Sequence, residues 1–375
     1  MTVLTFVFLV LGVATLVMGA ESLVRGAARL AARTGMSNVV IGLTVVAFGT
    51  SAPELAVSIG DVLSGGDEAG SLAIGNVVGS NIANILLALG LAAAAGGALV
   101  VARRIVRIDV PIMIGVSVVL WLLVLDEQLG RIEGIGLTIG LICYITWTVL
   151  AARREESQTG EPMELLEIDL DPAALRRHTV WGDLGAVLLG LVLLVLGSQA
   201  LVSAASDIAA ELGVSDLVIG LTVVAIGTSL PEVATSVIAS MRGQRDLAVG
   251  NAVGSNLFNI LAVLGITAAI APNPLPVAPS AIQIDIPIMI AVAIACLPIF
   301  ANGHVLERWE GVLFLGLYLG YIVWLVLDAS EHGVRESYRS VALYFVIPIV
   351  VITMTVIVVR GFRLRAAARQ FEPTA

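Results

Sequence analysis

The sequence predicts an all-α polytopic membrane protein, built from two inverted-topology repeats of five transmembrane helices plus one extra C-terminal helix. Three observations lead to this fold class: the composition, a series of long apolar segments, and an internal duplication. Of the 375 residues, 58% are hydrophobic and 13% are charged, whereas a typical soluble domain has about 25% charged residues. The net charge of −9 argues in addition against a nucleic-acid-binding protein.

Apolar segments of bilayer length follow one another along the whole chain. A transmembrane helix needs about 20 apolar residues, and eleven segments meet this condition. The predicted spans are residues 2–24, 36–62, 70–97, 108–126, 131–151, 181–204, 214–241, 246–271, 284–301, 306–328 and 340–360. They define a first repeat (1–151), a cytoplasmic linker (152–180), a second, inverted repeat (181–328), and an extra helix with a basic cytoplasmic tail (329–375).

The arginines predict the orientation of the spans. The chain has no lysine, and an N-terminus outside places all arginines but Arg131, Arg335 and Arg339 on the inner side. Cytoplasmic connectors carry an excess of basic residues in multi-pass membrane proteins. We therefore expect a multi-pass protein of the cell (inner) membrane with its N-terminus outside and its C-terminus inside.

Two motifs occur twice. Residues 42–54 read GLTVVAFGTSAPE and residues 220–232 read GLTVVAIGTSLPE; residues 75–86 read GNVVGSNIANIL and residues 250–261 read GNAVGSNLFNIL. Each copy belongs to five spans, and an odd number of spans reverses the polarity of the second copy. Inverted repeats of this kind are typical of secondary transporters that work by alternating access.

The first motif predicts a broken helix with polar groups inside the membrane. Pro53 and Pro231 lack an N–H and disrupt the helix one turn earlier, so we expect carbonyls near Ala47 and Ala225 to leave the helical ladder. Glu54 and Glu232 are the two acids predicted at mid-depth, where a buried carboxylate without a partner costs roughly 3 kcal/mol. Helical spacing adds hydroxyl groups to the same helix faces: Thr50, Ser51, Thr228 and Ser229.

The second motif supplies further oxygen ligands at a similar depth. Ser80 and Asn84 are four residues apart, as are Ser255 and Asn259. Carboxylate, hydroxyl, amide and carbonyl oxygens suit hard cations such as Ca²⁺, and two glutamates neutralise one Ca²⁺ or two Na⁺. Asn76 and Asn251 fit helix packing as well as they fit the site.

Other classes of function find little support. Cys143 and Cys296 lie in apolar runs and indicate neither a disulfide framework nor a metal site. Without lysine, and with all histidines in polar connectors, the spans cannot form a Ser–Lys or Ser–His centre. We therefore predict no enzyme, no cofactor and no obligate protein partner; a passive channel is the stronger rival.

On these duplicated motifs, the chain resembles the cation/calcium antiporter superfamily, and within it the prokaryotic sodium/calcium exchanger family. The resemblance covers residues 1–328 and implies ten core helices in two inverted halves that exchange Na⁺ for Ca²⁺. It implies a calcium site at Glu54, Glu232, Thr50 and Thr228. It also implies sodium sites with the Ala47 carbonyl, Ser51 and Ser80 on one side, and the Ala225 carbonyl, Ser229 and Ser255 on the other, with Asn84 and Asn259 as fourth ligands.

Two departures bear on the coupling ion. Some members of the family have an aspartate where Asn259 stands, so this site is less negative, and stoichiometry and potassium coupling stay open. Relatives that exchange protons for calcium usually have an acid where Ser80 and Ser255 stand. We therefore expect sodium/calcium antiport. The alternative that the sequence leaves open is exchange of H⁺ or another cation against Ca²⁺ on the same fold.

Overall fold

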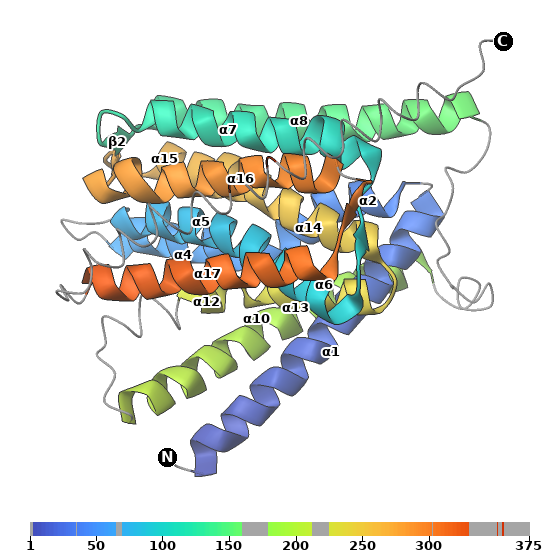
Figure 1. Cartoon of the computed structure of the whole chain (residues 1–375), viewed down its shortest axis with the longest axis horizontal. Helices are drawn as coiled ribbons and strands as arrows, with labels where there is room; N and C mark the ends of the chain where they lie inside the picture. The colour runs from blue at the N-terminus through green and yellow to red at the C-terminus, as the bar shows by residue number, and fades with distance from the viewer. Residues whose placement is uncertain are drawn as a thin grey trace.

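The computed structural model describes residues 3–34, 36–64, 70–159, 179–211, 225–301, 303–329, 351 and 355. These residues are mostly helical (Figure 1), as predicted. Within them, nine helices are long and apolar enough to cross a membrane. They are Thr5–Thr34, Asn38–Leu63, Leu72–Gly96, Ile105–Leu123, Arg131–Ala151, Val180–Glu211, Arg245–Ile270, Ala281–Phe300 and Arg308–Leu327.

The two remaining predicted spans are described only in part. Span 214–241 is described from Ala225 onward and contains the shorter apolar helix Leu230–Met241. Span 340–360 is described only at Val351 and Thr355. Residues 160–178 of the predicted linker also lie outside the described part of the chain. The count of eleven spans and the orientation therefore stay predictions.

The first repeat contains α-helices, short π-helical segments (η) and two short strands. Its elements are α1 (Val3–Thr34), α2 (Asn38–Ile41), η1 (Gly42–Val46), α3 (Ala47–Thr50), α4 (Ala52–Ser64), α5 (Ser71–Ala83), η2 (Asn84–Leu89), α6 (Gly90–Gly96), β1 (Leu99–Val100), η3 (Ile105–Asp109), α7 (Val110–Leu123), β2 (Gln128–Leu129) and α8 (Arg131–Thr159). The π-helical segments were not predicted from the sequence.

The second repeat follows the same order where it is described. Its elements are α10 (Val180–Glu211), α12 (Ala225–Thr228), α13 (Leu230–Met241), α14 (Arg245–Phe258), η5 (Asn259–Leu264), α15 (Gly265–Ile270), β3 (Leu275–Pro276), η6 (Ala281–Asp285), α16 (Ile286–Ala301), β4 (Val305–Leu306) and α17 (Arg308–Ala329). The segments η2 and η5 begin at the equivalent residues Asn84 and Asn259, so the duplication extends to local backbone geometry.

Two short antiparallel ribbons tie the repeats together. β1 pairs with β4, with Leu99 opposite Leu306, and β2 pairs with β3, with Leu129 opposite Leu275. Each ribbon joins one connector from each repeat. The predicted orientation places the two connectors of each ribbon on the same side of the membrane.

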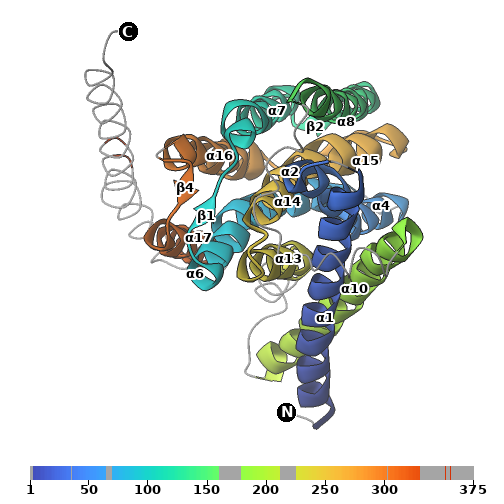
Figure 2. The same cartoon turned by 90° about the vertical axis from the view of Figure 1, so that its right-hand side faces the viewer.

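Helices α1 and α10 form a long crossed pair beside the other helices (Figure 2). Both exceed their predicted ends, because α1 continues to Thr34 and α10 to Glu211. Glycines at seven-residue spacing bring the two backbones into contact: a Cβ atom on Gly19 would lie 2.7 Å from the Leu194 nitrogen, and one on Gly190 would lie 2.6 Å from the Leu23 nitrogen. Small residues at helix interfaces allow this close approach.

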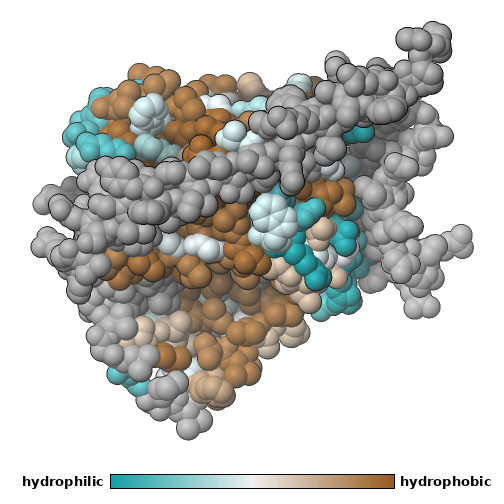
Figure 3. Space-filling view, in the orientation of Figure 1, coloured by the Kyte–Doolittle hydropathy of each residue, from teal (hydrophilic) through white to brown (hydrophobic). Residues whose placement is uncertain are grey.

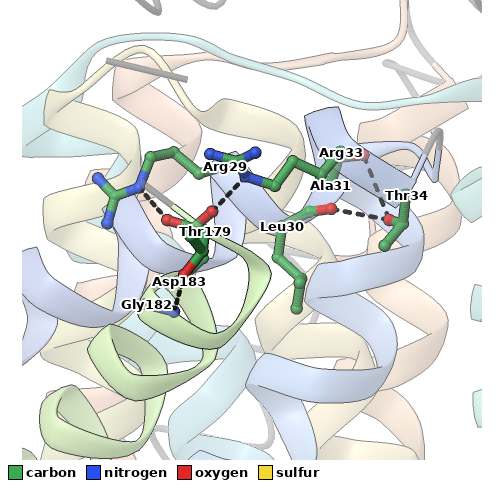
Figure 4. Close-up of polar contacts among 8 residues, drawn as sticks. All are labelled: Arg29, Leu30, Ala31, Arg33, Thr34, Thr179, Gly182 and Asp183. Carbon is green, nitrogen blue, oxygen red and sulfur yellow. Dashed lines mark hydrogen bonds and ion pairs between the residues drawn. The ribbon is translucent and has the colours of Figure 1, made fainter. Parts of the chain in front are cut away.

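A buried ion pair fastens one end of this helix pair (Figure 4). The Asp183 carboxylate, fully buried, accepts from Arg29 Nε at 2.5 Å and from Arg33 Nε at 2.6 Å. The arginines that extend α1 beyond its predicted end therefore meet an acid at the start of α10. This contact accounts for the buried carboxylate of Asp183.

The interior and the surface are both apolar, as a bilayer requires. Helix α14 is buried from Leu247 to Phe258, and it lies among helices of both repeats (Figures 1 and 2). Large apolar side chains are exposed on the outside, including Leu188, Val192 and Leu196 of α10. In the space-filling view, apolar surface spreads over the described helices (Figure 3).

Candidate cation site

The two GTS-x-PE segments break their helices at equivalent points. Ser51 lies between α3 and α4 with φ −81° and ψ 2°, and Ser229 lies between α12 and α13 with φ −86° and ψ 0°. Proline two residues later cannot donate to the preceding turn. In the second repeat this leaves the Gly227 carbonyl to a side-chain donor, the Ser198 hydroxyl of α10.

One expectation about these breaks is wrong. The Ala47 carbonyl does not leave the helical ladder, because it accepts the Ser51 N–H at 3.0 Å. The Pro53 ring removes only its own N–H, and the residue two positions earlier still completes a normal helical bond. For Ala225, the structure shows only that α12 begins there. Both alanines stay predictions as ligands.

Glu54 and Glu232 lie in one buried network of polar side chains. Both are fully buried. Ser80 Oγ donates to Glu54 Oε1 at 3.2 Å, and Ser51 Oγ donates to Glu232 Oε1 at 3.4 Å. Ser229 Oγ donates to Ser80 Oγ at 3.0 Å. Each repeat thus supplies hydroxyl groups around the acids, and the first repeat's Ser51 reaches the second repeat's acid.

The threonines are held by two asparagines whose role the sequence left open. Thr50 Oγ1 donates to Asn251 Oδ1 at 3.2 Å and lies 3.3 Å from Ser255 Oγ. Thr228 Oγ1 donates to Asn76 Oδ1 at 3.3 Å. The two asparagines therefore orient the threonine side chains through these hydrogen bonds.

The same asparagines also contact the backbone of the acids. Asn76 Nδ2 donates to the Glu54 carbonyl, and Asn251 Nδ2 donates to the Glu232 carbonyl, both at 3.3 Å. The equivalence holds across the repeats, since both bonds join the second motif of a repeat to its first motif. These contacts fix the turn of helix that carries each carboxylate.

Asn84 and Asn259 are both fully buried, but their side-chain amides differ in hydrogen bonding. Asn259 Nδ2 donates to Asn81 Oδ1 at 3.0 Å, whereas neither amide atom of Asn84 has a hydrogen-bond partner among the described residues. Asn81 was not among the predicted site residues. It stands in the duplicated GSN sequence, and repetition alone could not separate a packing role from a role at the site.

Within the part of the chain that the structure describes, four buried oxygens at these residues have no hydrogen-bond partner: Glu54 Oε2, Glu232 Oε2, Asn84 Oδ1 and Asn259 Oδ1. Buried polar atoms are nearly always paired in proteins. The described residues contain no group of three or more His, Cys, Asp or Glu side chains that could hold a metal ion. The candidate cation site is therefore the pair of carboxylates, Glu54 and Glu232. Oxygen ligands of this kind suit Na⁺ or Ca²⁺ rather than softer metals.

Other buried acids have partners of their own. Asp109 accepts from Tyr144 Oη at 3.0 Å and lies 3.6 Å from Arg104 Nε, and Asp183 pairs with two arginines. Glu310 accepts the Glu307 N–H at 2.8 Å. In the described chain, no ion pair with a basic side chain is found for Glu54 or Glu232. A bundle of membrane helices with two such carboxylates in its interior is typical of a membrane transport protein.

Comparison with known proteins gives the family. The profile described as "Sodium/calcium exchanger protein" matches residues 4–150 and 183–327. The chain therefore belongs to the sodium/calcium exchanger family, a family of membrane antiporters, and is a multi-pass membrane protein. This confirms the resemblance found from the duplicated motifs.

Individual relatives agree over most of the chain. It is 38% identical over 298 residues to CaxA of Alkalimonas amylolytica (78% of this chain, 89% of that protein). It is 32% identical over 351 residues to the sodium/calcium exchanger MaX1 of Methanosarcina acetivorans (86% of this chain, 99% of that protein). The structure of the sodium-calcium exchanger NCX_Mj, soaked with 10 mM Na⁺ and zero Ca²⁺, is similar with a TM-score of 0.71 and 30% identity, over 86% of this chain and 99% of that one.

Proposed function

We propose that this protein exchanges Na⁺ for Ca²⁺ across the membrane by alternating access. The observation that carries the proposal is the pair of buried carboxylates, Glu54 and Glu232, each with one oxygen left without a partner. The family makes the protein an exchanger, and the hard oxygen set supports Na⁺ and Ca²⁺ as its substrates.

In this proposal Ca²⁺ loses most of its water and binds between the two carboxylates, with Thr50 and Thr228 as further ligands. Na⁺ ions use the flanking hydroxyls of Ser51 and Ser80 on one side, and Ser229 and Ser255 on the other. Asn84 and Asn259 complete these positions, and the Ala47 and Ala225 carbonyls contribute backbone oxygens. Because these sites share oxygens, Na⁺ and Ca²⁺ compete, and binding of one drives release of the other.

The inverted repeats provide the alternation. With eleven spans, an outer N-terminus and an inner C-terminus, the site lies between two halves of opposite polarity. Rocking one half against the other exposes the same oxygens to each side in turn. If a net charge moves per cycle, a membrane potential of −100 mV contributes about 2.3 kcal/mol for each charge, and the cycle favours calcium efflux.

The direct test is calcium flux into vesicles that contain the purified protein. We expect ⁴⁵Ca²⁺ uptake when Na⁺ is loaded inside and diluted outside, and little uptake after a pH jump without Na⁺. Uptake that follows the pH jump and ignores the Na⁺ gradient would reject sodium coupling and establish the proton/calcium alternative. Passive equilibration of Ca²⁺ without either gradient would identify a channel.

A further inference from the structure

Asn81 and Asn256 form a reciprocal clasp between the two repeats. Asn81 Nδ2 donates to the Asn256 carbonyl and Asn256 Nδ2 donates to the Asn81 carbonyl, both at 3.3 Å. The clasp joins α5 to α14. Because the two residues are equivalent in the duplicated GSN sequence, their shared contact lies between the two halves in a symmetric arrangement.

The rest of their surroundings is also duplicated. Asn81 Nδ2 lies 3.5 Å from Met289 Sδ, and Asn256 Nδ2 lies 3.5 Å from Met113 Sδ. The amide nitrogens of both residues are thus used in the same way. If the symmetry extended to the whole side chains, the two side-chain oxygens would have equivalent partners as well.

The two oxygens are not equivalent. Asn81 Oδ1 accepts from Asn259 Nδ2 at 3.0 Å. The matching bond in the other half, from Asn84 Nδ2 to Asn256 Oδ1, is missing, since both of those buried atoms lack a partner in the described chain. Around the clasp, the symmetry is therefore broken where each half holds its fourth-ligand asparagine.

The bond to Asn81 determines which end of the Asn259 amide is free. With Nδ2 engaged, the unpartnered atom is Oδ1, which is the end that binds a cation, because the amide nitrogen only donates. The Asn84 amide has no such restraint. Asn259 also begins the π-helical segment η5, and such segments are frequent at functional sites.

We infer that Asn81 is a positioning residue: it holds the Asn259 amide across the repeat boundary so that Oδ1 is presented to a bound cation. This inference rests on the proposed function and identifies a residue that acts on the site without binding the ion. It differs from a packing role because it predicts an effect on ion affinity that depends on Asn259.

The test is a double-substitution cycle read out as Ca²⁺ affinity of the purified full chain, measured by equilibrium dialysis with ⁴⁵Ca²⁺. Asn81→Leu removes the acceptor at similar size. We expect about five-fold weaker Ca²⁺ binding, the loss of roughly one hydrogen bond. The same substitution should weaken binding to a similar extent in an Asn84→Ala background, but less than two-fold in an Asn259→Ala background.

Losses that are equal in the Asn84→Ala and Asn259→Ala backgrounds would overturn the inference, as would an Asn81→Leu protein with unchanged affinity. If Asn81→Leu does not yield folded protein, Asn81→Ser is measured in its place, because its short side chain also cannot hold Asn259. Absence of Ca²⁺ binding by the unsubstituted chain would reject the proposed function and this role together, whereas binding that ignores Asn81 rejects the role alone.

Discussion

At the scale of single residues, the buried acids fall into two groups according to the side chains that contact them. Asp183 is neutralised by two arginines, and Asp109 lies beside Arg104. In the described part of the chain, Glu54 and Glu232 are surrounded by hydroxyl groups and amides instead. This arrangement supports the proposed role of the two carboxylates as ligands of a transported cation.

The first prediction concerns these two carboxylates. Glu54→Gln and Glu232→Gln should each weaken Ca²⁺ binding by about 100-fold or more, since removing one partner of a buried charge interaction costs about 3–5 kcal/mol and 1.4 kcal/mol is a factor of ten. Sodium-driven ⁴⁵Ca²⁺ uptake should fall to background. The control is Asp126→Asn, an exposed acid, which should retain uptake. Normal turnover in either glutamine variant would mean that the acids are structural.

A second prediction concerns Asp183. Asp183→Asn leaves two arginines without their buried carboxylate and should lower the free energy of unfolding by about 1–3 kcal/mol, seen as a lower Tm of the detergent-solubilised protein. Glu21→Gln is the matched control, because the Glu21 side chain is 31% exposed and exposed ion pairs contribute at most about 1 kcal/mol. Equal Tm values for the two variants would show that the buried pair adds nothing.

Sequence alone could bring the acids and hydroxyls together, because Thr50, Ser51 and Glu54 share one short segment and recur in the second repeat. It could not pair Thr50 with Asn251 or Ser51 with Glu232. Each contact joins residues of different repeats, and the two residues are 201 and 181 positions apart in the sequence, respectively. Ser198 gave no signal at all. It lies in an ordinary apolar helix, and only the packing of α10 against the break at Gly227 gives it a role.

At the scale of elements, polar side chains of the site lie at the helix breaks and at the first residues of the segments η2 and η5. Proline marks the breaks in the sequence, so these could be predicted. The segments η2 and η5 could not, because a π-helical turn has no simple periodic pattern in composition. Each of the two segments begins at an asparagine, η2 at Asn84 and η5 at Asn259.

The third prediction tests the glycine contact of α1 with α10. Gly19→Ala places a Cβ atom 2.7 Å from the Leu194 nitrogen, so the helices must move apart, at a cost of about 1–3 kcal/mol that should lower Tm. Gly185→Ala on α10 is the control, since no atom of the described chain lies within 4 Å of its Cβ position. The control should be neutral or slightly stabilised, because alanine favours helix over glycine. A Gly19→Ala protein as stable as the control would contradict the close crossing.

At the scale of the whole molecule, the ribbons β1–β4 and β2–β3 connect the repeats at two places, while α1 and α10 stand together to one side (Figure 2). The predicted odd number of spans in each repeat would bring equivalent motifs into the site from opposite directions. The sequence shows the duplication plainly, because the motifs are long and nearly identical. It placed the ends of α1 and α10 too early, because polar residues beyond the apolar run continue both helices.

The fourth prediction concerns orientation. In a chain with Cys143 and Cys296 replaced by alanine, a membrane-impermeant maleimide should label Asp126→Cys in intact cells. It should label Arg103→Cys only after the membrane is opened. Both positions are exposed and lie in connectors that the arginine distribution assigns to opposite sides. The reverse pattern would contradict an outer N-terminus.

The most direct test of the account is the location of the bound ion. Crystals soaked in Ca²⁺ without Na⁺ should show one anomalous peak bound by oxygens of both Glu54 and Glu232, at about 2.3–2.6 Å, and the peak should disappear in high Na⁺. A Ca²⁺ ion bound elsewhere, or none within reach of both carboxylates, would contradict the central claim that the two repeats each supply one acid to a shared cation.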